Sequence, residues 1–309
     1  MKYRPYLKLF AITAMFFLGF FPSLCAAKYP SKPVKVIVPW AAGGGTDILT
    51  RTVLTVMDKY FPQPMVVVNK TGGAGTVGMT FGLMAKPDGY TIIVNGFGPT
   101  CTQPHLKDLQ YTEKDYVVVC QLNKIPRILI ANNKTPYNNM KEMMSYAKKN
   151  PGKIKVAVAG VGTSGHLGMV QIEQDFGVKF TIIPQGGGAH QKTAVMGGHA
   201  DIAPTTANEG GPLVYAKQVK ALGIMDEVRF AEHPEMPTLA EQGFPNNTYV
   251  LWHVYAPAKT PPDRVKMLEE AFRKCLQDKT LQKMAKKLNL GLEFKNGKTA
   301  TADLNHWRI

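Results

Sequence analysis

One stretch of the chain decides its fold class: Val34-Lys-Val-Ile-Val-Pro-Trp-Ala-Ala-Gly-Gly-Gly-Thr-Asp47. It starts as a β-branched, apolar run typical of a buried strand, passes through a glycine turn, and continues into a helical pattern over residues 48–60. A strand, a turn and a helix in this order form the repeating unit of α/β proteins. The stretch therefore predicts an α/β fold.

The same turn predicts an anion-binding site. Gly43, Gly44 and Gly45 have no Cβ, so a ligand can approach the backbone closely. The first N–H groups of the following helix lack intrahelical partners and lie at the positive end of its dipole. Asp47 leaves two alternatives open, because its carboxylate either caps the helix or meets an amine or a bound water of the ligand. Arg51 is expected to pair with Asp47 at the i, i+4 spacing.

Apolar runs alternate with helical segments along the rest of the chain, which favours mostly parallel sheets. A first set of strands is expected over residues 34–38, 65–69, 91–95 and 117–122, and a second set over 127–131, 153–159, 180–183, 201–204 and 219–224. A late strand over 249–255 and one or two helices over 264–288 are expected to return to the first set. Two lobes with a ligand cleft between them follow, lobe 1 over 28–125 plus about 226–309 and lobe 2 over about 126–225.

The first residues predict a secretory signal peptide. Three basic residues within the first eight precede an apolar run over 9–24 and a cleavage site of small residues ending at Ala27. A membrane anchor is the alternative, but the run is near the short limit for a span and Pro22 interrupts it. We expect residues 1–27 to be removed and the mature protein to be periplasmic.

Charge and cysteine content exclude several classes. The chain carries a formal charge of +15, but its lysines are scattered and accompany no nucleic-acid-binding motif, so no nucleic-acid partner is expected. Beyond the leader, Cys101, Cys120 and Cys275 lack the spacing of a metal site or a catalytic thiol, while a disulfide between Cys101 and Cys120 stays open.

Two segments match the pattern GxGxxG, Gly73–Gly78 and Gly160–Gly165, but neither predicts a dinucleotide site. The acidic residue that should follow about 20 positions later is missing after both. No cofactor is expected. Close approach of a small anion explains the glycines instead.

The second of these segments is the natural partner of the first glycine turn. Gly162-Thr163-Ser164-Gly165-His166 supplies two hydroxyl groups and N–H donors at another helix start, where Thr163 or Ser164 is alternatively only an N-cap. If each turn holds one carboxylate, the lobes close around a di- or tricarboxylate.

A secreted hydrolase is the strongest rival class, with Ser164 as nucleophile, His166 as base and an acid such as Asp201. The spacing does not fit the G-x-S-x-G nucleophile elbow, so no catalytic residue is predicted. His166, His190 and His199 fit no metal-ligand spacing either. The sequence therefore favours a binding protein over an enzyme.

Several motifs in order resemble the Bug-type receptors of tripartite tricarboxylate transporters. They are residues 29–47, 69–78, 86–91, 146–153, 160–167, 197–201, 220–222 and 237–243, and so cover nearly the whole mature chain. The resemblance implies a two-lobed, type II-like periplasmic binding protein, monomeric, which delivers an organic anion to a separate membrane permease. A sensor that presents its liganded cleft to a signalling partner is the alternative.

The family's ligand loops correspond here to Pro39–Asp47 and Gly162–His166. The candidate ligand-binding residues are Trp40, Ala41, Gly43, Gly44, Gly45, Thr46, Asp47, Gly162, Thr163, Ser164, His166 and Gln185. Trp40 either walls the ligand or packs in the core. Gln185-Gly186 stands where family members often have Tyr-Lys, which leaves the identity of the ligand open, and a further helical segment is expected after Ile309.

Overall fold

The computed structural model of the protein describes residues 28–306. The predicted signal peptide, residues 1–27, and residues 307–309 lie outside the described part. The chain divides into two units, Met1–Ser31 and Lys32–Ile309, and the fold below is that of the second. None of the helices described has the length and apolar character needed to cross a bilayer.

A first group of strands is built around β1, whose Val36, Ile37 and Val38 side chains are fully buried. Its members are β1 (Val34–Val38), β2 (Met65–Asn69), β3 (Thr91–Gly96), β9 (Tyr249–Pro257), β4 (Tyr116–Ala131) and β10 (Leu292–Asn296). β1 lies between β2 and β3 and is parallel to both. β9 then pairs antiparallel with β3 and β4, and β10 pairs antiparallel with β4.

A second group of strands shares β4 with the first. Its other members are β5 (Lys155–Val158), β6 (Thr181–Pro184), β7 (Ile202–Thr206) and β8 (Lys220–Met225). β5 is parallel to β6 and β7, whereas the last part of β4, Arg127–Ala131, is antiparallel to both β7 and β8. β4 is therefore one 16-residue strand in place of the two predicted over 117–122 and 127–131.

The prediction of mostly parallel sheets is wrong, since β4, β8, β9 and β10 all pair antiparallel. Alternating strands and helices give parallel neighbours only where a helix returns the chain between them. No helix lies between the end of β8 at Met225 and the start of β9 at Tyr249. β9 consequently enters between β3 and β4 in the opposite direction.

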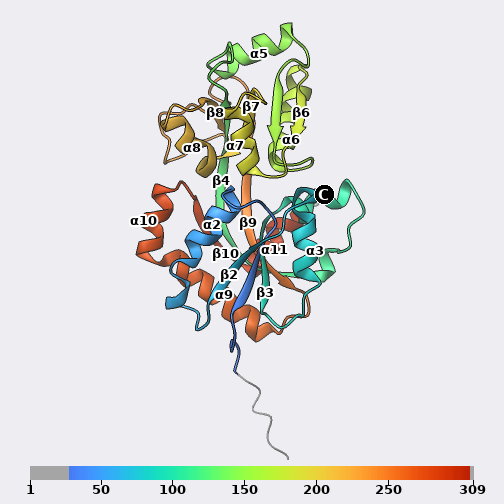
Figure 1. Cartoon of the computed structure of the whole chain (residues 1–309), viewed down its shortest axis with the longest axis vertical. Helices are drawn as coiled ribbons and strands as arrows, with labels where there is room; N and C mark the ends of the chain where they lie inside the picture. The colour runs from blue at the N-terminus through green and yellow to red at the C-terminus, as the bar shows by residue number, and fades with distance from the viewer. Residues whose placement is uncertain (1–27, 307–309) are drawn as a thin grey trace, which may run out of the picture. The chain divides into compact units, whose positions relative to one another are not determined.

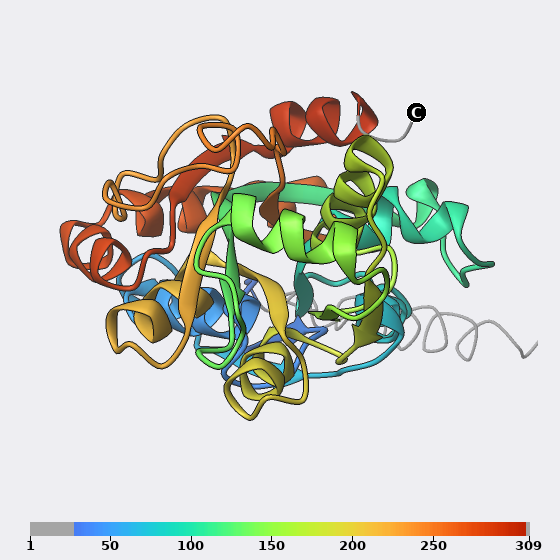
Figure 2. The ribbon, with the colours of Figure 1, turned by 90° about the horizontal axis from the view of Figure 1, so that it is seen from above.

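The helices cover the strands of both groups (Figure 1). They are α2 (Gly45–Leu54), α3 (Thr76–Leu83), α4 (Gly98–Cys101), α5 (Met140–Lys149), α6 (Ser164–Phe176), α7 (Gly188–Met196), α8 (Ala207–Tyr215), α9 (Pro262–Gln277), α10 (Lys279–Lys287) and α11 (Gly297–His306). The view from above places α11, in red, and α2, in blue, on opposite sides of the first group (Figure 2). As predicted, the chain over 264–288 forms two helices that return to the first group, where α9 contacts β4, β10 and α2.

The helix predicted over residues 48–60 is shorter than expected. α2 ends at Leu54, and a separate 3₁₀ turn follows at Met57–Lys59. The Thr55 N–H donates to the carbonyl of Thr52, which tightens the last turn and ends the α-helical ladder.

Two clusters of buried apolar side chains stabilise the two strand groups. One includes Ile37, Met79 and Tyr255, and the other includes Leu129, Met169 and Leu239. Leu239 belongs to the second cluster although it lies beyond residue 225, and the lobe boundaries stay predictions. Cys101, Cys120 and Cys275 are buried free thiols, and burial raises the pKa of Cys275 to about 12.

Candidate functional site

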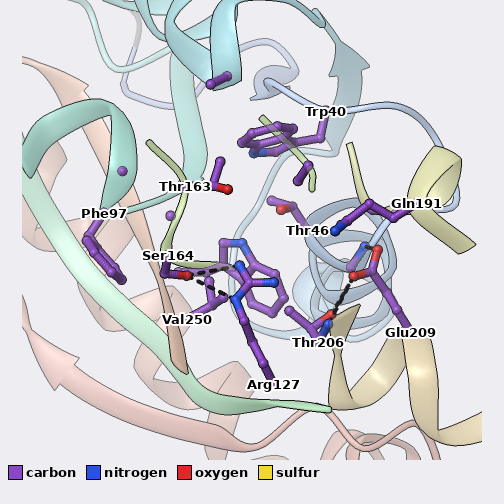
Figure 3. A pocket seen from close by; sticks show the side chains of 18 of the residues that line it. Trp40, Thr46, Phe97, Arg127, Thr163, Ser164, Gln191, Thr206, Glu209 and Val250 are labelled. Carbon is purple, nitrogen blue, oxygen red and sulfur yellow. Dashed lines mark hydrogen bonds between the residues drawn. The ribbon is translucent and has the colours of Figure 1, made fainter. Parts of the chain in front are cut away.

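A cavity of about 70 Å³ lies where both strand groups contribute residues. Its wall is formed by the turns that precede α2, α4 and α6, by the first residues of α7 and α8, and by side chains of β4 and β9 (Figure 3). By volume it holds about five water molecules, so a compact ligand suits it. The lining residues are Trp40, Gly44, Gly45, Thr46, Ala74, Gly96, Phe97, Gly98, Pro99, Arg127, Ala159, Thr163, Ser164, Gly188, Gln191, Thr206, Glu209, Val250 and Trp252.

Half of the candidate residues from the sequence meet at this cavity. Those that line it are Trp40, Gly44, Gly45, Thr46, Thr163 and Ser164. Those that do not line it are Ala41, Gly43, Asp47, Gly162, His166 and Gln185. Both glycine turns are thus present at one cavity, and the residues outside it have other contacts.

Asp47 folds the first turn onto its own helix. Its carboxylate is 3% exposed and accepts hydrogen bonds from the Gly43 N–H at 2.9 Å, Asn69 Nδ2 at 3.0 Å and Arg51 Nε at 3.0 Å. Burial raises the pKa of Asp47, but the hydrogen bonds from Arg51, Gly43 and Asn69 outweigh this effect and hold the pKa below its usual value. The expected pair with Arg51 is confirmed. The Gly43 N–H that Asp47 accepts precedes α2, which has no side-chain cap, so the two alternatives for Asp47 stay predictions.

Gly162 and His166 shape the second turn. Gly162 has a φ of +75°, a conformation that favours glycine, and its N–H donates to His166 Nδ1 at 3.2 Å. The carbonyl of Gly162 accepts a hydrogen bond from Thr102 Oγ1 at 2.6 Å, which ties this turn to the first strand group. Burial lowers the pKa of His166. Because Ser164 bonds to Arg127 and His166 to Gly162, the pair does not have the contacts of a nucleophile and its base.

Gln185 lies apart from the cavity. Its N–H donates to the carbonyl of Val158, and its side chain lines a separate depression beside His190 and His199. Within residues 28–306 no group of three or more His, Cys, Asp or Glu side chains could hold a metal ion.

Aromatic side chains form the apolar walls of the cavity. Trp40 lines it while donating from Nε1 to Asn95 Oδ1 at 3.0 Å, which fixes the plane of its indole. Trp252, 4% exposed, and Phe97 line it as well. These rings can pack against the carbon skeleton of a ligand.

Arg127 on β4 is the most important residue that the sequence reasoning missed. It is 6% exposed, and its Nε and Nη2 donate to Ser164 Oγ at 3.1 and 2.9 Å while Nη1 donates to the Pro204 carbonyl at 2.7 Å. Burial lowers the pKa of Arg127 to about 10, so the guanidinium stays charged at neutral pH. A Cβ on Gly165 would lie 3.1 Å from the guanidinium, which explains the glycine there.

Glu209 near the start of α8 is the second residue that was missed. Its Oε1 accepts the Gly45 N–H at 2.7 Å, and its Oε2 accepts the Thr206 hydroxyl at 2.6 Å within a capping box. A Cβ on Gly188, the first residue of α7, would overlap Oε1. The carboxylate thus lies at the starts of α2, α7 and α8. The sequence analysis predicted that the Gly45 N–H binds a ligand anion. In the structure this N–H donates to Glu209 instead.

The sequence contains a pattern that indicates each of these two residues. Arg127 is the lone charge in the apolar run from Ile125 to Ala131, and such a charge in a buried strand needs a partner or a ligand. Glu209 follows Thr206 at the capping-box spacing. Neither signal reveals that the two side chains meet at one cavity.

The cavity therefore has two polar sides. Arg127, Ser164 and the start of α6 form a side rich in hydrogen-bond donors, and Glu209, Thr206 and Gln191 lie across from it (Figure 3). An anion gains hydrogen bonds and charge attraction on the first side.

Comparison with known proteins places the chain in a family. The model of the tripartite tricarboxylate transporter family receptor matches residues 49–301. A UPF0065 protein of Bordetella pertussis, strain Tohama I, is 32% identical over 272 residues, which cover 87% of this chain and 84% of that protein.

Solved structures agree with this result. The periplasmic binding protein BugD has a TM-score of 0.83 at 29% identity, with 91% of this chain and 95% of that one covered. MatC from Rhodopseudomonas palustris, solved with bound malate, has a TM-score of 0.82 at 26% identity, with 91% and 99% covered. The predicted two-lobed periplasmic binding protein fold is confirmed. The chain belongs to the family of tripartite tricarboxylate transporter receptors.

Proposed function

We propose that this protein is a periplasmic receptor that captures a small organic acid in the cavity and delivers it to a membrane permease of the tripartite tricarboxylate type. The observation that carries the proposal is Arg127, a buried guanidinium that lines the cavity and takes part in no ion pair among the residues described. A buried charge is costly unless it is paired. A carboxylate ligand supplies the missing pair.

The start of α6 supports the same assignment. Ser164 and Gly165 are its first residues, and their N–H groups have no acceptor within the helix. Together with the Arg127 guanidinium they offer a carboxylate both charge and directed hydrogen bonds. The related receptor MatC, solved with malate, supports an organic acid as the ligand class.

Capture follows from the position of the cavity between the two strand groups. A ligand that contacts both groups favours the closed arrangement in proportion to its higher affinity for that arrangement. No bond is made or broken, and Ser164 and His166 act in binding and loop shape and not in hydrolysis. Export rests on the predicted signal peptide over residues 1–27.

A thermal-shift and calorimetric panel tests the proposal on residues 28–309. The panel contains acetate, benzoate, succinate, malate, citrate and the acidic and neutral amino acids. A ligand at about 100 times its Kd stabilises the native state by about 2.7 kcal/mol, a rise in Tm of roughly 5 °C for a chain of this length. If none of these acids shifts the Tm of the folded protein, the receptor assignment to acids is wrong.

Delivery to a permease is tested in cells. Uptake of the radiolabelled acid identified above is measured in a strain that lacks the gene for this protein, then after complementation with the wild type or Arg127→Met. We expect the wild type alone to restore uptake. Uptake that is unchanged in the deletion strain would remove transport and leave the sensor alternative.

A further inference from the structure

The cavity holds two buried, opposite charges that do not neutralise each other. Arg127 and Glu209 both line it, at 6% and 4% exposure, and neither forms an ion pair with any described residue. Glu209 still acts on Arg127 through space, as it partly offsets the effect of burial on the Arg127 pKa. Figure 3 shows the two side chains on different sides of the cavity. A ligand between them meets a cation on one side and an anion on the other.

The Arg127 side has donors to spare. A guanidinium carries five N–H bonds, and three hydrogen bonds from Arg127 are made, two to Ser164 Oγ and one to the Pro204 carbonyl. The remaining donors on Nη1 and Nη2 are available to a ligand carboxylate. This side needs an anion.

The Glu209 side has acceptors to spare. Its carboxylate offers about four acceptor positions, and its hydrogen bonds come from the Gly45 N–H, the Thr206 N–H and the Thr206 hydroxyl. One position is left, next to a full negative charge. A second carboxylate of a ligand would be repelled there, whereas an ammonium group would be attracted.

Gln191 gives an independent indication of the same kind. It is 1% exposed, lines the cavity, and has an Oε1 without any hydrogen-bond partner among the described residues. Its Nε2 donates to the Ala157 carbonyl at 2.9 Å, and a flipped amide would instead oppose two oxygens. The unpaired atom is thus an acceptor, and a buried acceptor requires a donor.

We propose that the ligand is a compact zwitterion, an amino acid whose carboxylate binds Arg127 and the start of α6 and whose ammonium group binds Glu209 and Gln191. The inference rests on the proposed function, since it names the class of acid that the receptor captures. The ammonium group supplies the donors that both acceptors lack. The cavity of about 70 Å³ and its walls of Trp40 and Trp252 suit a short carbon skeleton.

Matched ligands test the ammonium group. Calorimetry on residues 28–309 uses the common L-amino acids and β-alanine, together with propionate, 3-hydroxypropionate, butyrate, succinate and malate. We expect at least one amino acid to bind at least tenfold more tightly than the acids that replace its ammonium group with a methyl, hydroxyl or carboxylate group. Tighter binding of succinate, malate or another acid than of every amino acid would overturn the zwitterion and leave the acid receptor intact. Binding of no acid of either kind would overturn both.

Variants assign the role to Glu209. Glu209→Gln keeps an oxygen that accepts the Gly45 N–H but removes the charge. We expect this variant to bind the best amino acid at least tenfold more weakly than the wild type does. The difference in affinity between that amino acid and succinate should become smaller. Glu227→Gln changes an exposed carboxylate in the segment after β8, is the matched control, and is expected to change neither affinity. Equal losses for amino acids and their uncharged analogues in Glu209→Gln would contradict an ammonium contact.

Discussion

The Gly45 N–H donates a hydrogen bond of 2.7 Å to Glu209 Oε1, and so joins two residues 164 positions apart. Gly45 begins α2 beside the first strand group, and Glu209 lies in the first turn of α8 beside the second. The cavity thus has a contact between its two sides that requires no ligand.

We predict that Glu209→Ala destabilises the protein. The Gly45 N–H then loses its acceptor in a buried site, which costs about 1–3 kcal/mol of unfolding free energy, whereas the Thr206 hydroxyl keeps Asn208 Oδ1 at 2.6 Å. Urea unfolding followed by circular dichroism measures this loss. Glu209→Gln retains an acceptor oxygen and is expected to lose less, and equal losses in both variants would contradict the role of the Gly45 hydrogen bond.

Arg127→Met separates binding from stability. A buried cation without an ion-pair partner contributes little net stability, and methionine fills a similar volume, so we expect the unfolding free energy to change by no more than about 2 kcal/mol. Binding of the acid identified by the panel is expected to fall about 100-fold or more, as measured by calorimetry.

Arg273→Met on α9 is the control for this loss. Arg273 pairs with the half-buried Glu270 and does not line the cavity, so this variant is expected to leave the affinity for the ligand unchanged. Full affinity in Arg127→Met would remove the guanidinium from the ligand site.

Asp47→Asn changes stability more than ligand preference. The carboxylate accepts from Gly43, Asn69 and Arg51, and its lowered pKa means that this stabilisation is present above the usual value of 3.8 and is lost as pH falls through the lower folded value. We therefore expect the wild type to exceed the variant in Tm at neutral pH, with the difference shrinking below about pH 4.

Thermal unfolding from pH 3 to pH 7 measures this difference. The ranking of ligands in the thermal-shift panel should be the same for both proteins. A changed ranking with an unchanged Tm would make Asp47 a ligand contact instead.

Gly45→Ala is expected to disturb closure. A Cβ there would lie 2.9 Å from Thr206 Oγ1 and 3.1 Å from the Trp252 ring, so the starts of α2 and α8 must move apart. Affinity for the ligand should fall, and small-angle scattering should report a larger radius of gyration. Gly98→Ala is the matched control for the radius of gyration alone, because its Cβ would come no closer than 3.6 Å to any atom beyond its own stretch of helix backbone but Gly98 itself lines the cavity. Equal effects of both substitutions on this radius would argue against a specific contact at Gly45.

Local patterns predicted much of the fold. The strand at Val34–Val38, the turn and the start of α2 lie within one short stretch, so the local sequence contains the whole signal. The direction of β9 was not predictable in this way, because it depends on a chain segment that returns without a helix. Strand periodicity reports burial, but it does not report which neighbour a strand pairs with.

The site was predicted in part for the same reason. Gly44 and Ser164 lie in glycine turns that mark helix starts, and both line the cavity. Arg127 and Glu209 reach the cavity from β4 and α8, and only the tertiary fold brings them together. Gln185 was taken from the resemblance, and in this chain its side chain lines a different depression.

The length of β4 has a mechanical consequence. Its first part pairs with β9, its last part pairs with β7 and β8, and no flexible linker interrupts it between the two. Any separation of the two strand groups must therefore be absorbed as curvature of the paired backbones of β4 and β9. Between the groups the ladder is two strands wide, with Lys124, Ile125 and Pro126 of β4 paired to Leu251, Val250 and Tyr249 of β9, and there it bends at least cost. The speed of ligand exchange would then depend on the stiffness of this short backbone segment as well as on the side chains that bind the ligand.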